Sequence, residues 1–578
     1  MQDIEKLRHS LAHLLAAAVL ELYPDTLNTI GPAVDNGFYY DFEFSAPLLE
    51  SSLKEIEKKM KKLSNNWESF EKKDVSAEEA REVFKHNPYK LELIEEILAK
   101  GEKLTLYTSG KFTDLCRGGH VENMKDVSMD AFKLSRVAGA YWRGDEKNKM
   151  LTRIYGLAFN TAEELEAYEK QQEEARKRDH RKIGKELDLF IFSELVGPGL
   201  PIYTPKGATI RREIINYSNE LQTSIGYEEV HTPNINKAEL FKVSGHYEKY
   251  KEDMFRVVSN YTTEEYYLKP MNCPHHTQIY ASKPHSYRDL PVRIADFANL
   301  YRDEKPGELN GLTRLRAFAQ DDGHCFCRED QIKEEFVAVL GIVKKAMETY
   351  GMKYTIHLSL WDPEHHEKYL GEAKTWEKSQ KLLEEILVEN NIEYIVALGE
   401  AAIYGPKMDL ISKDSLGREW QISTIQLDFI MPERFGLKYT DSDGSEKTPV
   451  MIHRAIVGSP ERFLGILIEH YAGNFPLWLS PTQVKVIPVR TNHNEYAEKV
   501  FKTLKDSNIR AELDDADENL GGKVRDAKNQ KLPYWIVIGD KEVESNTVTL
   551  ESRDNGQLGQ ISVEELVSKL KEEIQNKK

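Results

Sequence analysis

The segment LYRDEKPGELNGLTRLRAFAQDD at residues 300–322 places cations on both sides of a glycine-containing turn. Arg302 precedes the turn, and Arg314 and Arg316 follow it, so the pattern predicts a hairpin that carries cations at both ends. Forked guanidinium groups suit the oxygens of a polyphosphate. Phe318 lies a few residues further on, where its ring can stack on a base. The segment therefore predicts a nucleotide-binding hairpin.

A second segment, GSPERFLGILIEH at residues 458–470, supports this interpretation. Arg462 follows Pro460 at the start of an apolar helical pattern, so its charge is expected beside a helix N-terminus, where anions are favoured. The chain contains no GxxxxGK[ST] and no GxGxxG after a strand. P-loop and Rossmann modes of nucleotide binding are therefore disfavoured.

One thiol and two imidazoles in the same part of the chain form a candidate zinc site. They are Cys273 in PMNCPHH, His324 in RAFAQDDGHCFC and His453 in VMIHRAI. Three such ligands with a fourth position open are typical of catalytic zinc. Their separations match no local spacing rule, and Cys325 and Cys327 are competing ligands. Spacing alone therefore favours the alternative, buried cysteines and scattered histidines.

A further group of polar residues lies near the N-terminus. In RHSLAH at 8–13 the two histidines are four residues apart, so on a helix their rings point the same way. The loop TDLCRGGHV at 113–121 adds an aspartate, a cysteine and a third histidine. The group is either a zinc set or a metal-free hydrolytic pocket in which imidazoles orient a water; ordinary helix histidines are the plainer alternative. Its members are His9, His13, Lys90, Asp114, Cys116 and His120.

Composition sets the frame for these sites. The 578 residues are enough for three or four domains, and 40% apolar with 30% charged residues is ordinary for a globular protein. Four cysteines are too few for a disulfide framework, which favours reduced thiols or metal ligands in a cytoplasmic protein. The polar N-terminus has no signal-peptide core, and residues 11–20 are too short to span a bilayer. A net charge of −17 argues against a non-specific nucleic-acid coat but allows a local basic surface.

Changes in pattern predict four parts: 1–160, 161–185, 186–480 and 481–578. The first part combines a helical apolar pattern at its start with a strand-like sequence from 103 to 160. Residues 161–185 carry charges of both signs at helical spacing, which predicts a solvated linker helix; its ARKRDHRK stretch could contact RNA phosphates. After 186–480, which mixes strands and helices, the last part alternates strand and helix as a compact α/β module.

Taken together, these segments resemble the threonyl-tRNA synthetases over nearly the whole chain. The pieces LYRDE, RLRAFAQDDGHCFC and HRAIVGSPERFLGILIEH resemble motifs 2 and 3 of class II aminoacyl-tRNA synthetases, and residues 206–233, ending GYEEVHTP, resemble motif 1, the dimerisation motif. PMNCP, YGPKMD and REWQISTIQLDF are specific to the threonyl branch. The resemblance implies an α+β multidomain chain with an antiparallel class II core, an N-terminal α+β editing domain and a C-terminal α/β anticodon-binding domain. The given sequence begins at the HxxxH helix, so the small ubiquitin-like domain with which many members begin is expected to be missing or truncated.

The resemblance also implies a reaction and its residues. Threonine would attack ATP to form threonyl-adenylate, and the terminal ribose of tRNA(Thr) would then take the threonyl group, in a cytoplasmic homodimer that uses neither membrane nor DNA. The α-phosphate would meet Arg302, the γ-phosphate Arg314 and Arg462, and the adenine Phe318 and Glu304, with Mg²⁺ bridging the phosphates. Zinc, one ion per chain, would lie on Cys273, His324 and His453, and Asp322 would accept the hydroxyl proton of threonine. The other implied pocket residues are Met271, Gln320, Tyr404, Lys407, Gln421 and Gln426, and His246 matches the proposed base.

A second, editing site follows from the chemistry of the competing amino acids. Valine lacks the hydroxyl group, so a zinc ligand would be unmet and valine is rejected, whereas serine lacks only a methyl, worth about 1–3 kcal/mol of discrimination. The N-terminal histidines would hydrolyse mischarged seryl-tRNA. Related alanyl modules hold zinc with this motif, but the threonyl resemblance implies water activation without a metal. The alternative is a free-standing editing hydrolase with a degenerate synthetase core, which the intact ATP arginines and zinc ligands oppose.

Three positions depart from the family pattern. His275 stands where MNCP is usually followed by Gly, which adds an imidazole beside the proposed zinc ligand. In the tail, Glu551 occupies a place where bacterial relatives often carry an anticodon-reading Arg, and Asp517 replaces an Asn. Glu542 is retained, and Arg553 is a nearby cation that could compensate.

Overall fold

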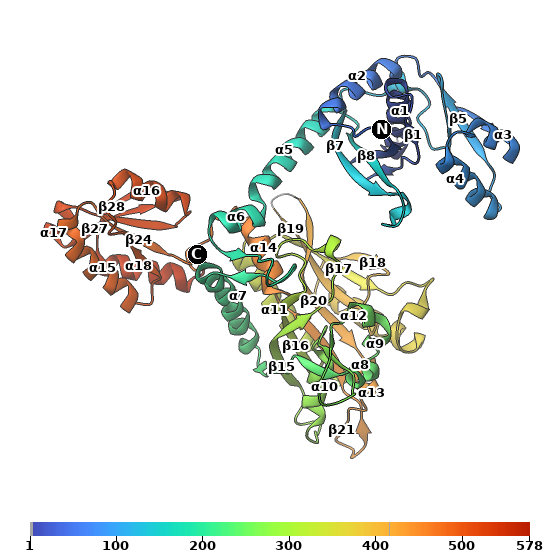
Figure 1. The fold of residues 1–578 in the computed structure, drawn as a ribbon. Coiled ribbons are helices and arrows are strands. Elements are labelled where there is room, and N and C mark those ends of the chain that lie inside the picture. The colour runs from blue at the N-terminus through green and yellow to red at the C-terminus, as the bar shows by residue number, and fades with distance from the viewer. Residues whose placement is uncertain (1–3, 415–416) are drawn as a thin grey trace. The chain divides into compact units, whose positions relative to one another are not determined.

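The computed structural model describes residues 4–414 and 417–578. The chain forms two compact units, one ending at Glu173 and one beginning at Glu174 (Figure 1). The division falls inside the segment for which the charge pattern predicts a linker.

The first unit is built on a five-stranded antiparallel sheet in the order β1–β3–β8–β7, with β2 paired to β3. Helices α1 and α2 cover it, and the apolar side chains Leu7, Leu11, Leu14 and Leu15 of α1 are buried as their spacing predicts. These elements are α1 (Ile4–Leu22), β1 (Leu27–Asn28), β2 (Ala33–Val34), β3 (Gly37–Glu43), α2 (Leu53–Ser64), β7 (Phe132–Tyr141) and β8 (Met150–Ala158).

A smaller three-stranded sheet, β4–β5–β6, lies in the same unit with two helices beside it. Its elements are β4 (Glu71–Asp74), α3 (Ala77–Val83), α4 (Pro88–Ala99), β5 (Thr105–Ser109) and β6 (Phe112–Leu115). The strand-like pattern from 103 to 160 is thus confirmed. The heavily charged stretch 50–75, whose amphipathic pattern predicts a helix, contains α2 but ends in strand β4, whose four residues are all exposed.

The predicted linker helix is two helices, α5 (Ala162–Arg178) and α6 (His180–Glu186). The break occurs at Asp179, whose side chain accepts a hydrogen bond from the backbone N–H of Arg181 and caps α6. Along α5 only Leu165 is buried, as the charge pattern predicts, but His180 and Ile183 of α6 are buried. The second half of this segment therefore belongs to the core of the second unit.

The second unit contains an eight-stranded sheet in the order β11–β15–β16–β23–β20–β19–β17–β18 (Figure 1). All neighbours are antiparallel except the two edge pairs, β11 with β15 and β17 with β18. The strands are β11 (Glu228–Glu229), β15 (Val292–Tyr301), β16 (Ala317–Cys327), β17 (Tyr354–Leu360), β18 (Ile395–Leu398), β19 (Lys407–Lys413), β20 (Glu419–Asp428) and β23 (Val450–Ala455). This antiparallel sheet is the core that the motifs predict.

Several helices bury their apolar faces in the main hydrophobic core against this sheet. Three of them are α7 (Pro205–Ser224), α11 (Ile332–Thr349) and α14 (Pro460–His470). Helix α12 (Ala373–Glu389) adds Leu383, Ile386 and Leu387 to the same core. The remaining helices around the sheet are α8 (Ala238–Ser244), α9 (His246–Tyr250), α10 (Cys273–Ala281) and α13 (Ile430–Arg434). The remaining short strands are β9 (Phe190–Ile191), β10 (Ile202–Tyr203), β12 (Ile235–Lys237), β13 (Arg256–Val257), β14 (Tyr266–Leu268), β21 (Tyr439–Thr440) and β22 (Glu446–Lys447).

The side chains of strand β16 form two sets, one that packs against the helices and one that lines a pocket, because successive residues of a strand face opposite sides of the sheet. One set faces the helices: Asp321 bonds Ser218 of α7, and Cys325 and Cys327 lie in the helical core. The other set, which begins with Phe318 and Gln320, lines a pocket on the opposite face. The alternation of β16 thus separates the core from a polar site.

The C-terminal module is a five-stranded sheet, β25–β24–β26–β27–β28, with helices beside it. Its elements are β24 (Val484–Pro488), α15 (Asn494–Asp506), β25 (Ala511–Leu513), α16 (Leu520–Asn529), β26 (Tyr534–Ile538), α17 (Asp540–Ser545), β27 (Thr547–Ser552), β28 (Gly556–Ser562) and α18 (Val563–Gln575). The strands and helices expected from the pattern are confirmed. Strand β28 lacks a predictive signal because its sequence, GQLGQIS, is polar and glycine-rich. Among the described residues, no helix is long and apolar enough to cross a lipid bilayer.

A buried ion pair holds the sheet to helix α7. The guanidinium of Arg454 donates to Asp321 at 2.5 Å and also to Gln222, and both charged side chains are at most 1% exposed. Replacing Asp321→Ala leaves a buried cation without its partner, so we expect the free energy of unfolding of this sheet to fall by about 3–5 kcal/mol. Hydrogen exchange of the β16 and β23 peptides in increasing urea measures it. Asp330→Ala, which removes an exposed partner of Arg328, is the control and should change little; equal effects would contradict the prediction.

Candidate active and editing sites

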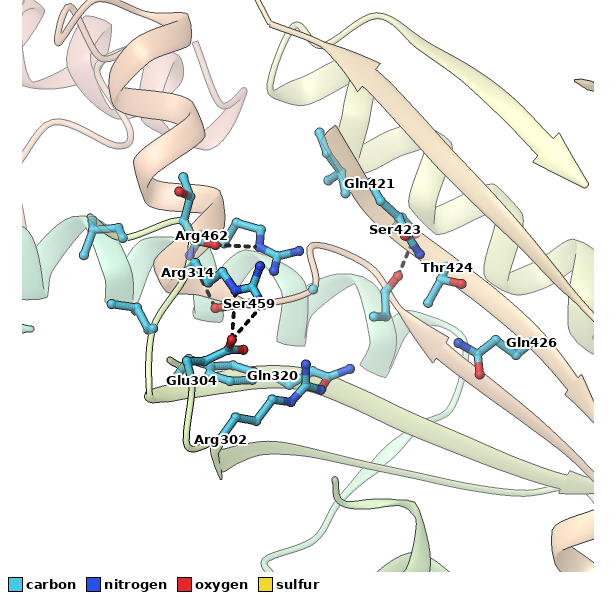
Figure 2. A pocket seen from close by; sticks show the side chains of 17 residues that line it. Arg302, Glu304, Arg314, Gln320, Gln421, Ser423, Thr424, Gln426, Ser459 and Arg462 are labelled. Atoms are coloured by element: carbon cyan, nitrogen blue, oxygen red, sulfur yellow. Dashed lines mark hydrogen bonds and ion pairs between the residues drawn. The ribbon is translucent and has the colours of Figure 1, made fainter. Parts of the chain in front are cut away.

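A cavity of about 260 Å³ opens on the polar face of the large sheet. Figure 2 shows its arginines converging from the β15–β16 connection and from α14, opposite the glutamines of β20. Among its lining residues are eight predicted from the sequence: Arg302, Glu304, Arg314, Phe318, Gln320, Gln421, Gln426 and Arg462. The structure therefore brings the hairpin and the start of α14 to one pocket, as the sequence predicts.

The three arginines of this pocket raise one another's electrostatic energy. Burial lowers the pKa of Arg462, and the charges of Arg302 and Arg314 lower it further. Arg314 has counter-charges in Glu304 and Glu308, at 2.8 and 2.7 Å. Arg462 instead donates from Nε to the backbone oxygen of Thr313 at 3.2 Å. Such clustered, partly buried cations provide strong stabilisation for a polyanion.

A carboxylate that the motif analysis did not single out organises the neighbouring strands. Asp409 of β19 is 3% exposed and accepts hydrogen bonds from Gln421 and Thr424 of β20, each at 2.7 Å, and from Ser359 of β17. It also pairs with Lys407. Its only sequence signal is its place in YGPKMD. Asp409 thus sets the direction of two predicted pocket residues, Lys407 and Gln421.

The remaining predicted pocket residues lie around Tyr404. The hydroxyl of Tyr404 donates to Gln426 at 2.6 Å, and its ring stacks on His453 with centroids 4.7 Å apart. Met271 packs in the same cluster as Tyr404 and Cys273. His246, at the start of α9, has its ring centroid 6.3 Å from that of Tyr404.

His246 is fully buried, and its Nδ1 contacts the hydroxyl of Ser244 at 2.8 Å. Burial, together with the charges of His453 and Arg302, lowers its pKa to about 3. The ring is therefore neutral at physiological pH. Its Nε2 has no hydrogen-bond partner among the described residues, so it is available to a ligand.

The proposed zinc ligands meet in space. Cys273, His324 and His453 are all buried, and the donor atoms that they offer lie within 4.8 Å of one another. The pairing of β16 with β23 puts His324 directly opposite His453, and α10 begins at Cys273. Cys325 belongs to the core on the helical side of the sheet, which removes it as a competitor.

Carboxylates and imidazoles surround this triad. Asp428 accepts a hydrogen bond from Nε2 of His453 at 2.9 Å, which leaves Nδ1 of that ring with its lone pair. His276 contacts Nδ1 of His324 at 2.6 Å. Asp322 lies 3.7 Å from Nε2 of His324, and burial raises the pKa of Asp322 to about 7. The unusual His275 does not join the triad; its Nε2 contacts Oδ1 of Asn236.

The N-terminal group also assembles, in the first unit, beside a cavity of about 430 Å³. The thiol of Cys116 lies 3.5 Å from Nε2 of His9 and 3.3 Å from Nε2 of His120. His13 completes the cluster, its ring 4.6 Å from that of His120. Burial lowers the pKa of all three imidazoles, so they are neutral at pH 7.

A buried charge pair lies next to these imidazoles. Lys90 and Asp114 are both 2% exposed and 2.5 Å apart. Tyr40 of β3 donates its hydroxyl hydrogen to Asp114 at 2.5 Å and accepts from Lys90 at 3.3 Å. Tyr40 is a pocket residue that could not be predicted from the sequence, because nothing in the amino-acid sequence of β3 distinguishes it from the core aromatics Phe38 and Phe42.

In the C-terminal module, Glu551, Arg553 and Glu542 have structural partners. Glu551 accepts a hydrogen bond from the indole of Trp535 at 3.0 Å. Arg553 donates to the backbone oxygens of Phe475 and Lys531, at 3.1 and 2.9 Å, and so ties the module to the residues that precede it. Glu542 accepts from Thr549 at 2.8 Å.

Comparison with known proteins agrees with this arrangement. Residues 255–471 match the tRNA synthetase class II core domain (G, H, P, S and T), residues 483–573 the anticodon binding domain, and residues 104–155 the threonyl and alanyl tRNA synthetase second additional domain. The sheet and its arginine pocket are therefore those of a class II aminoacyl-tRNA synthetase.

Individual relatives narrow the class to one family. The chain is 48% identical to the threonine–tRNA ligase of Staphylococcus carnosus, over 100% of this chain and 89% of the relative. It is 49% identical to that of Deinococcus radiodurans, over 94% and 85%. The solved RNA binding domain of threonyl-tRNA synthetase from Cryptosporidium parvum Iowa II matches with a TM-score of 0.66 and 36% identity, over 68% of this chain and 98% of that one. The chain belongs to the threonine–tRNA ligase family. A match of this extent does not support a free-standing editing hydrolase.

The cysteine of the N-terminal pocket provides a test of its electrostatics. Burial, with a smaller contribution from the neighbouring Asp114, raises the pKa of Cys116 to about 11. Because only the thiolate is nucleophilic, the alkylation rate of Cys116 should rise about tenfold per pH unit between pH 7 and 10 and level off near 11. Mass spectrometry of the iodoacetamide adduct measures this rate. A plateau below pH 8, or complete protection that a chelator removes, would contradict a neutral thiol and indicate a bound metal.

Proposed function

We propose that this chain joins L-threonine to tRNA(Thr) in an ATP-dependent reaction on the polar face of its large sheet. The observation that carries the proposal is the convergence of Arg302, Arg314 and Arg462 on a single pocket, in which Glu304 and Glu308 pair with Arg314. Three guanidinium groups held close together need anionic charge, and a triphosphate provides it. Mg²⁺ enters with ATP as the counter-ion of its phosphates.

In the first step a carboxylate oxygen of threonine attacks the α-phosphorus of ATP. A new phosphorus–oxygen bond forms, the bond to the β-phosphate oxygen breaks, and pyrophosphate leaves with the bonding electrons. Arg302 stabilises the charge on the α-phosphate, and Arg314 and Arg462 hold the γ-phosphate. Phe318 and Glu304 bind the adenine ring. No side chain needs to act as a nucleophile.

The residues around Cys273 fit a zinc ion. One soft thiolate and two imidazoles, buried and within reach of a common centre, are ligands that zinc prefers. Asp428 also fixes the tautomer of His453, as carboxylates do in zinc sites. A bound zinc ion would supply a Lewis-acidic centre with open positions for the amine and hydroxyl of threonine.

The other pocket residues complete threonine recognition. Asp322 accepts the hydroxyl proton of the substrate, and its position beside His324 puts it next to the amino-acid end of the pocket. Tyr404, Gln426 and Met271 enclose this end, while Lys407 and Gln421, oriented by Asp409, line the side facing the adenylate. Gln320 lines the same pocket as the arginines, Gln421 and Gln426 (Figure 2).

In the second step the terminal ribose hydroxyl of tRNA attacks the threonyl carbonyl, an ester bond to the ribose forms, and AMP leaves with the electrons of the broken carbon–oxygen bond. His246 is the proposed base, because its ring is neutral and its Nε2 is available. A pKa near 3 makes it a weak proton acceptor on its own. The negative phosphate of a bound adenylate raises that pKa, so the ring gains basicity when the intermediate is present.

The N-terminal pocket is proposed to hydrolyse seryl-tRNA(Thr). The neutral rings of His9, His13 and His120 can accept a proton from an attacking water, and Lys90 can stabilise the developing negative charge. Cys116 remains a thiol because its pKa is raised, so water is the expected nucleophile. We infer that this pocket works without a metal.

We further infer that the protein acts as a homodimer in the cytoplasm, where tRNA and ATP occur. The hairpin β9–β10 and its connection expose several large apolar side chains next to α7, which lies in the motif 1 stretch. They are Ile191, Phe192, Leu195, Val196 and Ile202, with Leu195 fully exposed. An apolar cluster of this kind is typical of a protein interface, and a second copy of the chain is the partner that motif 1 implies.

Exchange of labelled pyrophosphate into ATP tests the ligase and its metal together. The purified full chain should carry about one zinc ion and should catalyse rapid exchange with threonine. The kcat/KM for exchange should be about 10–200-fold lower with serine and at least 10⁴-fold lower with valine. Cys273→Ala should lose both the zinc and the exchange, whereas Cys327→Ala, another buried thiol, should keep them. Full activity of Cys273→Ala would refute the zinc role. If none of the amino acids supports exchange while seryl-tRNA is still hydrolysed, the result would favour the alternative of an editing hydrolase.

A substitution in the editing pocket should impair editing without impairing threonine activation, because the two pockets lie in different units. His9→Ala should lower the hydrolysis of seryl-tRNA(Thr) by about 10²–10⁴-fold and leave threonine-dependent exchange unchanged. His86→Ala, an exposed histidine of the same unit, is the control. Deacylation of labelled seryl-tRNA measures the effect. Hydrolysis that persists in His9→Ala at the rate of the control would contradict the assignment.

A further inference from the structure

A buried histidine outside both pockets contacts the loop that builds the nucleotide site. His180 is the first residue of α6 and is 3% exposed. Its Nδ1 lies 2.7 Å from a carboxylate oxygen of Glu469 in α14, and its backbone N–H donates to the same oxygen at 3.1 Å. Its Nε2 lies 3.0 Å from the backbone nitrogen of Leu312. One imidazole therefore joins three elements that are distant in the sequence.

The partners of the ring determine its tautomer. The carboxylate of Glu469 also pairs with Arg418, and its Oε1 accepts the backbone N–H of His180, while the backbone N–H of Leu312 donates to Nε2 of the ring. Nδ1 of His180 must then carry the hydrogen. Burial lowers the pKa of His180 to about 4, so Nε2 holds a lone pair, which accepts the N–H of Leu312. This arrangement leaves the ring no nitrogen for a metal ion, although Asp179, His180 and Glu469 are grouped closely enough to hold one.

The backbone next to this hydrogen bond is shaped to fit the ring. Gly311 has a positive φ of 49°, and a Cβ at this position would lie 2.1 Å from Nε2 of His180. On α14, Gly465 leaves room for Leu312, whose Cβ would be 3.3 Å from an added methyl group. Two glycines thus let the loop and the helix close on His180 and Leu312.

The held loop leads directly to the arginines of the nucleotide pocket. The residues after Leu312 are Thr313, whose oxygen accepts from Nε of Arg462 at 3.2 Å, and Arg314. The turn is tight, because the backbone N–H groups of Thr313 and Arg314 both donate to the oxygen of Asn310. A shift of Leu312 would therefore displace the oxygen that orients Arg462 and the backbone of Arg314.

We propose that His180 is a positioning residue for ATP binding: its Nε2 accepts the N–H of Leu312 and fixes the 310–314 turn that directs Arg314 and Arg462 at the phosphates. The inference rests on the proposed ATP site. It gives a role to the one residue of the ARKRDHRK stretch that turns away from solvent, and the role differs from contact with RNA.

Two substitutions separate the two bonds of the ring in the full chain. In His180→Asn the side-chain amide occupies the place of Nδ1 and can still donate to Glu469, but it cannot reach Leu312. In His180→Gln the amide oxygen occupies the place of Nε2 and can accept from Leu312, while the bond to Glu469 is lost. Each variant removes one buried hydrogen bond, so both should melt at a lower temperature than the parent.

Pyrophosphate exchange distinguishes positioning from simple stabilisation. In His180→Asn we expect the KM for ATP to rise about 3–10-fold while the KM for threonine stays within twofold of the parent, since a lost hydrogen bond corresponds to a change of this size. In His180→Gln the KM for ATP should remain near that of the parent. Equal KM values for ATP in both variants and the parent would overturn the proposal, and so would a joint rise of the KM values for ATP and threonine in both variants.

Two further variants keep the test decisive. Gly311→Ala drives the loop away from the ring without touching the pair of His180 with Glu469, so it should raise the KM for ATP even if neither His180 variant folds; an unchanged KM would overturn the proposal. Arg462→Ala tests the underlying ATP site. If Arg462→Ala leaves the KM for ATP unchanged, the proposed ATP site fails; if it raises that KM while His180→Asn and Gly311→Ala do not, only the role of His180 fails.

Discussion

The register of three antiparallel strands, β15, β16 and β23, is the constraint on which the synthetase site depends. It places His324 opposite His453 and Asp322 opposite Asp296. Because side chains alternate along a strand, a slip of one residue would turn Gln320, Asp322 and His324 of β16 into the helical core and bring Asp321, Cys325 and Cys327 to the pocket. The apolar helices α7, α11 and α14 make such a slip costly, so packing on one face fixes the chemistry on the other.

Buried charge is handled differently on the two faces of this sheet. On the helical face Arg454 and Asp321 neutralise each other, and the carboxylate also accepts from Ser218 and two backbone N–H groups. On the pocket face the arginines are left with an excess of positive charge, and burial lowers the pKa of His324 and His246, which keeps these two rings neutral. The first arrangement stabilises the fold, whereas the second raises the affinity for an anionic ligand at the expense of the unliganded protein.

Much of the candidate site could be predicted from the sequence because its residues carry chemical signals of their own. Arginines beside a turn, a proline before an apolar helix, and cysteine with histidine indicate phosphate and metal chemistry wherever they lie. Asp409, Asp428 and Tyr40 could not be found in this way. Each is an ordinary strand residue, and its importance comes only from the partners that the sheet brings to it. These partners are Gln421 and Lys407 for Asp409, His453 for Asp428, and Asp114 for Tyr40. The same holds for His180, which the charge pattern assigns to a solvated helix.

By itself the sequence determined which groups are available and the local elements that hold them: the arginine hairpin, the start of α14, the HxxxH helix, and the strand and helix order of the C-terminal module. Spacing and composition control these features, because they depend on residues close together in the chain. Only the tertiary structure decided that Cys273 meets His324 and His453, that Cys325 does not, and that His180 holds the loop before Arg314. Those contacts join residues far apart in the chain, and they exist because strand register and helix packing leave one arrangement that buries the apolar faces and satisfies the buried polar groups.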